Sequence, residues 1–195
     1  MMNGKEKIGI FGSAAGAPAI AIAQARALGE ALTEHDVVLI TGACSGIPYE
    51  VVHSAYQKNR QIEVWGFSPA RNLEEHTREY PHDDHTIYRR LEYIPQEFSI
   101  EDITVRRKYR NVFSTATCDA GIIVSGRWGT MNEFTNLFDM GKIIGVLTET
   151  GGVADRLGEW SKEISKPSKA VVVYEHDPQK LVERVLEEID HRRTL

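Results

Sequence analysis

Residues 119–142, DAGIIVSGRWGTMNEFTNLFDMGK, decide the fold of this chain. The apolar run Ala120–Val124 predicts a buried strand, residues 125–130 form a short glycine-containing turn, and a helical pattern with an early carboxylate, Glu133, follows at once. The first N–H groups of a helix have no partners within the helix, and the helix dipole places partial positive charge there. A strand, a glycine turn and a helix in this order therefore predict an anion site, suited to a phosphorylated ligand and with a carboxylate close by.

The rest of the chain repeats this alternation of apolar runs and helical patterns. We expect strands at residues 7–11, 37–41, 63–67, 91–94, 120–124, 143–147 and 170–174. We expect helices at about residues 17–32, 48–58, 103–117, 130–141, 152–164 and 177–190. Near-continuous apolar strands in repeated βα units imply a parallel sheet with helices on both faces. We therefore predict a single doubly wound, Rossmann-like α/β domain over residues 1–195, with about seven mostly parallel strands and its ligand at their carboxyl ends.

Residues 68–100 break this rhythm, because they are rich in proline, histidine, arginine and acidic residues. Long stretches of this kind are often binding loops or lids, so we expect a loop elaboration over the ligand cleft. Within it, Pro81-His82-Asp83-Asp84-His85 suggests a metal site, but a polar loop without helical spacing favours a solvated segment. We expect neither a metal nor a cofactor.

Composition and charge limit the partners and the compartment. The 195 residues, 42% of them hydrophobic, allow one sizeable core, and the formal net charge is −5. We take this acidic balance to argue against nucleic-acid and membrane-surface binding, which need a basic footprint. Cys44 and Cys118 lie far apart without ligand spacing, and no signal-like or membrane-spanning apolar run is found, so we predict a cytoplasmic protein.

Three turns that follow predicted strands are expected to meet at one edge of the sheet. They are neither a GxGxxG fingerprint nor a P-loop, and glycines in tight turns also serve packing alone. The predicted ligand and phosphate contacts from these turns are Gly12, Ser13, Gly42, Ser45, Gly46, Ser125, Gly126, Arg127, Gly129 and Thr130. Trp128, within the third turn, is expected to pack or to stack on a base.

A basic cluster opens the predicted helix at residues 103–117. Arg106 and Arg110 would share one helical face, with Arg107 about 100° round the axis. One face must pack on the sheet, so only some of these side chains can reach the cleft. A solvated basic face is the alternative interpretation.

Several of these motifs together resemble a known family. Ser125-Gly126-Arg127-Trp128-Gly129-Thr130-Met131-Asn132-Glu133 aligns with the signature Pro-Gly-Gly-x-Gly-Thr-x-x-Glu, Arg107-Lys108 matches an Arg-Lys pair, and residues 41–48 look like the family's glycine-rich second turn. From Gly9 to Leu147 the chain resembles the Lonely Guy family of nucleoside-monophosphate phosphoribohydrolases, often labelled lysine decarboxylases. It equally resembles their wider Rossmann-like relatives, which include molybdenum-cofactor carrier proteins.

The resemblance implies a reaction and its residues. Arg107 and Glu133 would be catalytic in hydrolysis of the N-glycosidic bond of a nucleoside 5′-monophosphate, and Gly126, Gly129 and Thr130 would cradle the phosphate. It also implies a homodimer or a higher homo-oligomer. Three positions depart from the family pattern: Ser125 for proline, Arg127 for glycine and Val105 for histidine. The alternative is a non-catalytic carrier or sensor of a phosphorylated ligand such as molybdenum cofactor.

Overall fold

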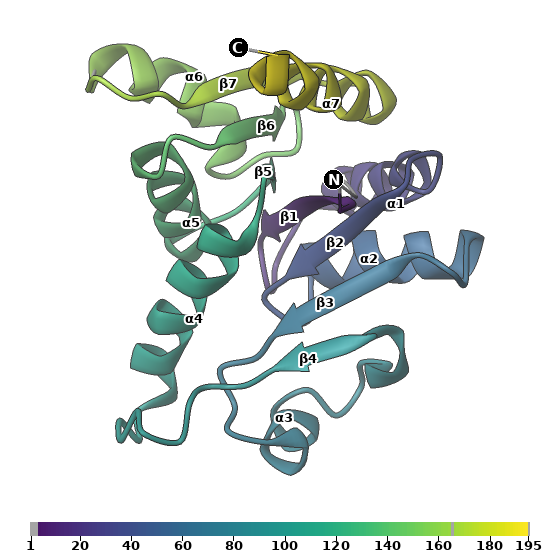
Figure 1. Cartoon of the computed structure of the whole chain (residues 1–195), viewed down its shortest axis with the longest axis vertical. Coiled ribbons are helices and arrows are strands. Elements are labelled where there is room, and N and C mark those ends of the chain that lie inside the picture. The colour runs from purple at the N-terminus through teal and green to yellow at the C-terminus, as the bar shows by residue number, and fades with distance from the viewer. Residues whose placement is uncertain (1–3, 165, 195) are drawn as a thin grey trace.

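A computed structural model describes residues 4–164 and 166–194, and one parallel sheet of seven strands organises them (Figure 1). The order across the sheet is β4-β3-β2-β1-β5-β6-β7, and every neighbouring pair is parallel. The strands are β1 (Glu6–Gly12), β2 (Val37–Thr41), β3 (Glu63–Phe67), β4 (Arg90–Glu92), β5 (Ala120–Val124), β6 (Ile143–Leu147) and β7 (Val171–Glu175). The predicted Rossmann-like α/β fold is therefore confirmed.

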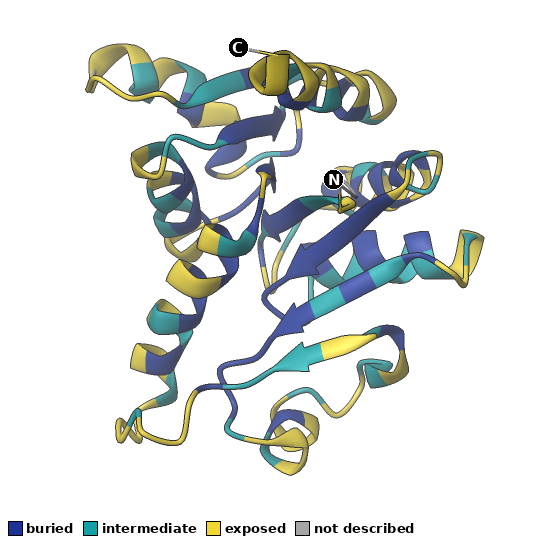
Figure 2. Ribbon diagram, viewed as in Figure 1, coloured by how far each residue is buried: buried dark blue, intermediate teal, exposed yellow. Residues whose placement is uncertain are grey.

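Helices cover both faces of this sheet. Residues of α1, α2 and α7 pack in one buried apolar cluster with β1 and β2, whereas α5 and α6 pack in a second cluster on the other face. Figure 2 shows the result: the central strands are buried and the outer helical surfaces are exposed. The helices are α1 (Ala19–Leu32), α2 (Ile47–Lys58), α3 (Leu73–Glu79), α4 (Ile103–Thr117), α5 (Trp128–Asp139), α6 (Ala154–Glu163) and α7 (Pro178–Thr194), with a 3₁₀ turn η1 (His85–Ile87).

The point where the chain changes direction across the sheet positions the site. From β1 the chain builds outward to β4, and it then returns through α4 to place β5 on the other side of β1. In open α/β sheets ligands bind beyond the carboxyl ends of the strands at such a switch. In Figure 1 the strands β1 to β4 point towards α4, which crosses this edge.

Residues 68–100 carry more regular structure than their sequence suggests. They contain α3 and η1, and the short strand expected near residues 91–94 is present as β4, which pairs with β3 at the sheet edge. Asn72 caps α3, because its side chain accepts a hydrogen bond from the backbone N–H of Glu75 at 2.9 Å. Polar caps and ion pairs define this segment, so its sequence shows no regular spacing of apolar residues from which its helices could be predicted. None of the described helices combines the length and apolarity that a membrane span needs.

Candidate functional site

The turns after β1, β2 and β5 meet at the carboxyl edge of the sheet, as predicted. The backbone N–H of Ile47 donates to the Ser13 carbonyl at 2.8 Å, and the N–H of Gly126 donates to the Ser13 hydroxyl at 3.2 Å. Ser13 therefore joins all three turns. Gly46 has φ +91°, and a β-carbon there would collide with the Ser13 backbone, so glycine at this position serves the packing of one turn on another.

A cavity of about 270 Å³ opens between these turns and α4. Its walls carry four cationic side chains but a single carboxylate, Glu133. The residues that line it are Gly12, Ser13, Ala14, Cys44, Thr104, Arg107, Lys108, Arg110, Asn111, Arg127, Gly129, Thr130 and Glu133. Although the chain as a whole has a net charge of −5, this cavity concentrates positive charge and suits an anionic ligand.

The first turn of α5 adds backbone donors to the cavity. Arg127 is the N-terminal capping residue of α5, and its side chain makes no capping hydrogen bond. The N–H groups of Trp128, Gly129 and Thr130 meet no acceptor within residues 4–164 and 166–194, while the next, on Met131, donates to the Arg127 carbonyl. A β-carbon on Gly129 would have no atom within 4 Å, so open space lies before it. Unpaired donors at a helix start suit an anion, so the geometry is compatible with the anion site that the sequence predicts.

Glu133 lies one turn into α5 at the floor of the cavity. The residue is 8% exposed. Burial raises the pKa of its carboxyl group to about 7, and the positive charges of Arg110 and Lys108 oppose this rise. Glu133 is therefore close to half-ionised near neutral pH, a state suited to accepting or donating a proton.

The arginine that acts most strongly on Glu133 is Arg110. Its guanidinium group is buried and donates to the backbone carbonyl groups of Gly42 and Phe67. A β-carbon at Gly42 would collide with this guanidinium, so Gly42 makes room for Arg110 and does not line the cavity. Arg107, which the resemblance pairs with Glu133, lies instead on the cavity wall with its side chain 42% exposed.

A scan against protein-family models matches residues 5–182 to the SLOG cluster4 family. The chain belongs to this family. The finer resemblance, to the Lonely Guy phosphoribohydrolases, is not established by this match. Among curated protein sequences none matches the chain.

Solved structures of the same fold cover almost all of this SLOG chain. The X-ray structure of TM1055 aligns with a TM-score of 0.74 at 15% identity, over 93% of this chain and 99% of that one. The molybdenum cofactor binding protein of Rippkaea orientalis aligns with a TM-score of 0.67 at 18% identity, over 97% and 99%. DNA processing protein A of Helicobacter pylori, described for its single-stranded DNA binding mode, aligns with a TM-score of 0.62 at 16% identity, over 94% and 81%.

The expectation that nucleic acid is excluded as a partner is wrong. A neighbour with this fold binds single-stranded DNA. The physical reason lies in the argument from net charge: a total of −5 describes the whole surface, whereas binding depends on local charge, and four cationic side chains line one cavity.

The predicted contact residues divide into those at the cavity and those behind it. Gly12, Ser13, Arg127, Gly129 and Thr130 line the cavity, as do Glu133 and Arg107. The others support the turns: Gly42 and Gly46 pack as described, Ser45 donates to Asp83, Ser125 donates its N–H to Thr150 at 2.8 Å, and Gly126 donates its N–H to Ser13. The lining residues that the sequence analysis did not propose are Ala14, Cys44, Thr104, Lys108, Arg110 and Asn111.

Two further observations concern Trp128 and the loop at residues 81–85. Trp128 is 83% exposed, so it does not pack in the core. Within the described part of the chain, no three His, Cys, Asp or Glu residues are arranged to hold a metal ion, and Asp83 in the 81–85 loop accepts from Ser45 at 2.9 Å and 3.0 Å.

Proposed function

We propose that this SLOG protein binds a nucleoside 5′-monophosphate in the cavity and hydrolyses its N-glycosidic bond to free base and ribose 5-phosphate. The observation that carries the proposal is the pairing of one buried carboxylate, Glu133, with a cationic cavity and the unpaired N–H groups of α5. Ligand pockets range upward from about 300 Å³, so a cavity of about 270 Å³ is at the small end of this range. It therefore suits a mononucleotide better than a dinucleotide.

In this proposal the phosphate lies at the start of α5, where Gly129, Thr130 and the Arg127 side chain surround it. Arg107 and Lys108 supply charge from the opposite wall. The ribose then lies over Glu133, one helical turn further on.

Glu133 and Arg110 act on the reacting bond. As the base leaves with the electron pair of its bond to C1′, positive charge develops on the ribose, and ionised Glu133 stabilises that charge. The same carboxylate takes a proton from the water whose oxygen bonds to C1′, the departing base takes up a proton from solvent, and Glu133 returns its proton to solvent after release. Arg110 favours the ionised form of Glu133. We therefore assign to Arg110 the role that the resemblance gives to Arg107, and place Arg107 in ligand binding.

Release of free base tests the proposal. Purified protein would be incubated with adenosine, guanosine, cytidine and uridine monophosphates and the free base measured. Because general acid–base groups contribute about 10²-fold to 10⁴-fold, we expect Glu133→Gln to lower release by at least about 100-fold. Glu74→Gln, on exposed α3, is the matched control and should leave release unchanged.

A carrier or sensor of a phosphorylated ligand is the second candidate. Arg127 favours it, because this side chain adds a cation where the phosphoribohydrolase signature has glycine. A thermal-shift screen with nucleotides, pterin phosphates and a short single-stranded oligonucleotide would identify a ligand, since binding only to the native state raises its stability. Binding that survives Glu133→Gln, with no base released by the wild type, would favour this carrier and contradict the hydrolase.

We further propose a homo-oligomer in a reducing, cytoplasmic compartment. Val105, Val112 and Phe113 leave apolar surface exposed on α4, and both Cys44 and Cys118 are free thiols. Sedimentation equilibrium of the purified protein tests the assembly.

A further inference from the structure

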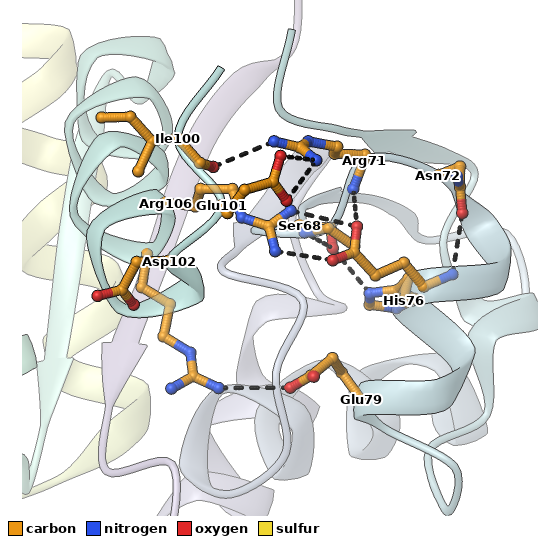
Figure 3. A network of polar contacts seen from close by, with 12 residues as sticks. Ser68, Arg71, Asn72, His76, Glu79, Ile100, Glu101, Asp102 and Arg106 are labelled. Atoms are coloured by element: carbon orange, nitrogen blue, oxygen red, sulfur yellow. Dashed lines mark hydrogen bonds and ion pairs between the residues drawn. The ribbon is translucent and has the colours of Figure 1, made fainter. Parts of the chain in front are cut away.

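Charged side chains connect the short helix α3 to the basic start of α4 (Figure 3). α3 carries Glu75 and Glu79, one helical turn apart, while α4 carries Arg106 and Arg107. The two resulting ion pairs are unequal. Their difference indicates which part of α3 is fixed and which part can be displaced.

The pair at the start of α3 is an anchor. Arg106 is 4% exposed and donates two hydrogen bonds to Glu75, at 2.7 Å and 3.2 Å. Glu75 also accepts from the backbone N–H of Arg71 at 2.7 Å, and Arg71 donates to Glu101 at 2.9 Å (Figure 3). A bidentate, largely buried pair of this kind is costly to break, because it leaves a charge without a partner.

The pair at the end of α3 is weak and touches the cavity. Arg107 Nη2 lies 3.6 Å from Glu79 Oε2, and the two side chains are 42% and 34% exposed. Exposed pairs of this kind contribute about 0–1 kcal/mol. Of the four cations that line the cavity, Arg107 alone forms an ion pair with a carboxylate among the residues that the structure describes.

The residue after Glu79 lies close to side chains that line the cavity. Tyr80 is the C-terminal capping residue of α3, and burial raises the pKa of its phenol. The groups that act on it electrostatically are Cys44, Arg110 and Arg107, which all line the cavity. The weak pair therefore includes a residue of the cavity wall, Arg107, whereas neither member of the anchoring pair lines the cavity.

We propose that α3 (Leu73–Glu79) is an acidic strap. Glu79 holds Arg107 in the free protein, and the anionic group of an entering ligand displaces Glu79 from Arg107. The Arg106–Glu75 anchor keeps the strap attached while its cavity end gives way. An internal carboxylate thus lowers the affinity of the cavity for anions. The inference rests on the proposed function only in taking the ligand to be anionic, and it needs no glycosidic chemistry.

Calorimetric titration with inorganic phosphate and with ribose 5-phosphate tests the competition. Since an exposed pair contributes up to about 1 kcal/mol, Glu79→Gln should bind both anions about twofold to fivefold more tightly. Glu74→Gln removes the same charge from the same helix without affecting a partner of Arg107, and its affinity for the anions should increase clearly less. Arg107→Gln should itself bind the anions less tightly than the wild type. When Glu79→Gln is added to Arg107→Gln, the affinity for the anions should not increase. Equal gains in the two glutamate variants, or a gain that persists without Arg107, would overturn the proposal.

A second measurement needs no bound ligand. Phenylglyoxal modifies accessible arginine side chains, and peptide mass spectrometry reports the rate at Arg107. We expect phenylglyoxal to modify Arg107 faster in Glu79→Gln than in the wild type, and at the wild-type rate in Glu74→Gln. Added phosphate should slow the modification of Arg107 in all three proteins. An unchanged rate in Glu79→Gln overturns the strap, whereas failure to release base would refute only the hydrolase.

Discussion

The two walls of the cavity are held together by different interactions. The turn wall, made by residues 12–16, 42–46 and 125–130, is joined by backbone hydrogen bonds and closely packed glycines. The helix wall, made by α4, is joined to α3 by ion pairs. Backbone contacts between buried turns fix positions, whereas pairs between long charged side chains can exchange partners. The comparison predicts a rigid anion site facing an adjustable cationic wall.

Loss of Arg106 should have the largest effect on stability. Breaking a buried pair from one side typically costs about 3–5 kcal/mol, so Arg106→Met should lower the free energy of unfolding by about that amount. Arg107→Gln breaks an exposed pair and should cost less than about 1 kcal/mol. Urea unfolding measures both. The double variant Arg106→Met/Glu75→Gln should recover most of the loss, and similar losses in the two single arginine variants would remove the distinction between the buried anchor and the exposed pair.

Glu133 should make stability depend on pH in the direction opposite to that of a salt-bridged carboxylate. Its pKa is about 7 in the folded state against 4.5 ordinarily, so between these values the native state binds more protons than the unfolded state. The contribution of protonated Glu133 to the free energy of unfolding is therefore fully present below pH 4.5 and decreases as the pH rises to 7. Above pH 7 it is lost. Glu133→Gln should therefore be more stable than the wild type at pH 8 by up to about 3 kcal/mol, and equal at pH 4.

Unfolding of both proteins at the two pH values measures this difference. Glu149→Gln, in the turn between β6 and α6, provides a control that carries the same change of charge. A constant difference between Glu133→Gln and the wild type from pH 4 to pH 8 would show that the Glu133 carboxyl has the same pKa in the folded and the unfolded state.

Within the turn wall, two glycines separate packing from ligand binding. Gly46→Ala forces a side chain into a φ of +91° and against Ser13, and should cost about 1–3 kcal/mol of stability. Gly129→Ala meets open space and should cost less than 1 kcal/mol, since glycine within a helix is itself unfavourable. Its effect should fall on phosphate binding instead. Thermal unfolding and phosphate titration of both variants measure the contrast, which equal stability losses would contradict.

The sequence predicted the sheet and the turn wall because their signals are local. Apolar runs marked the seven strands, and the strand–turn–helix stretch at residues 119–142 marked the start of α5. The glycines were harder to interpret: Gly12, Gly46 and Gly129 look alike in sequence, yet only Gly129 faces open space. What surrounds each one depends on neighbouring turns that lie far away in the chain.

The helix wall could not be predicted in the same way, since its contacts cross long intervals of sequence. Arg106 and Arg110 were correctly placed on one face of α4, but a solvated basic face was the alternative. The face is buried because Glu75, 31 residues earlier, pairs with Arg106, and because carbonyl groups of Gly42 and Phe67 receive Arg110. Residues 68–100 show no regular spacing of apolar residues, so nothing in the sequence indicated that they would supply Glu75 as the partner of Arg106.

Trp128 gives the smallest of these effects and tests where the turn wall ends. It is the first residue of α5, flanked by Arg127 and Gly129, which both line the cavity. Side chains on a helix lean towards its N-terminus, so we expect this 83% exposed indole to lie beside the proposed anion site. Stacking of a base on an aromatic ring contributes about 1–3 kcal/mol. Trp128→Ala should weaken adenosine monophosphate binding about tenfold and leave ribose 5-phosphate binding unchanged, with Trp128→Phe intermediate. Equal weakening of both ligands would place Trp128 in the phosphate site, and no weakening of either would place the base inside the cavity, away from the indole.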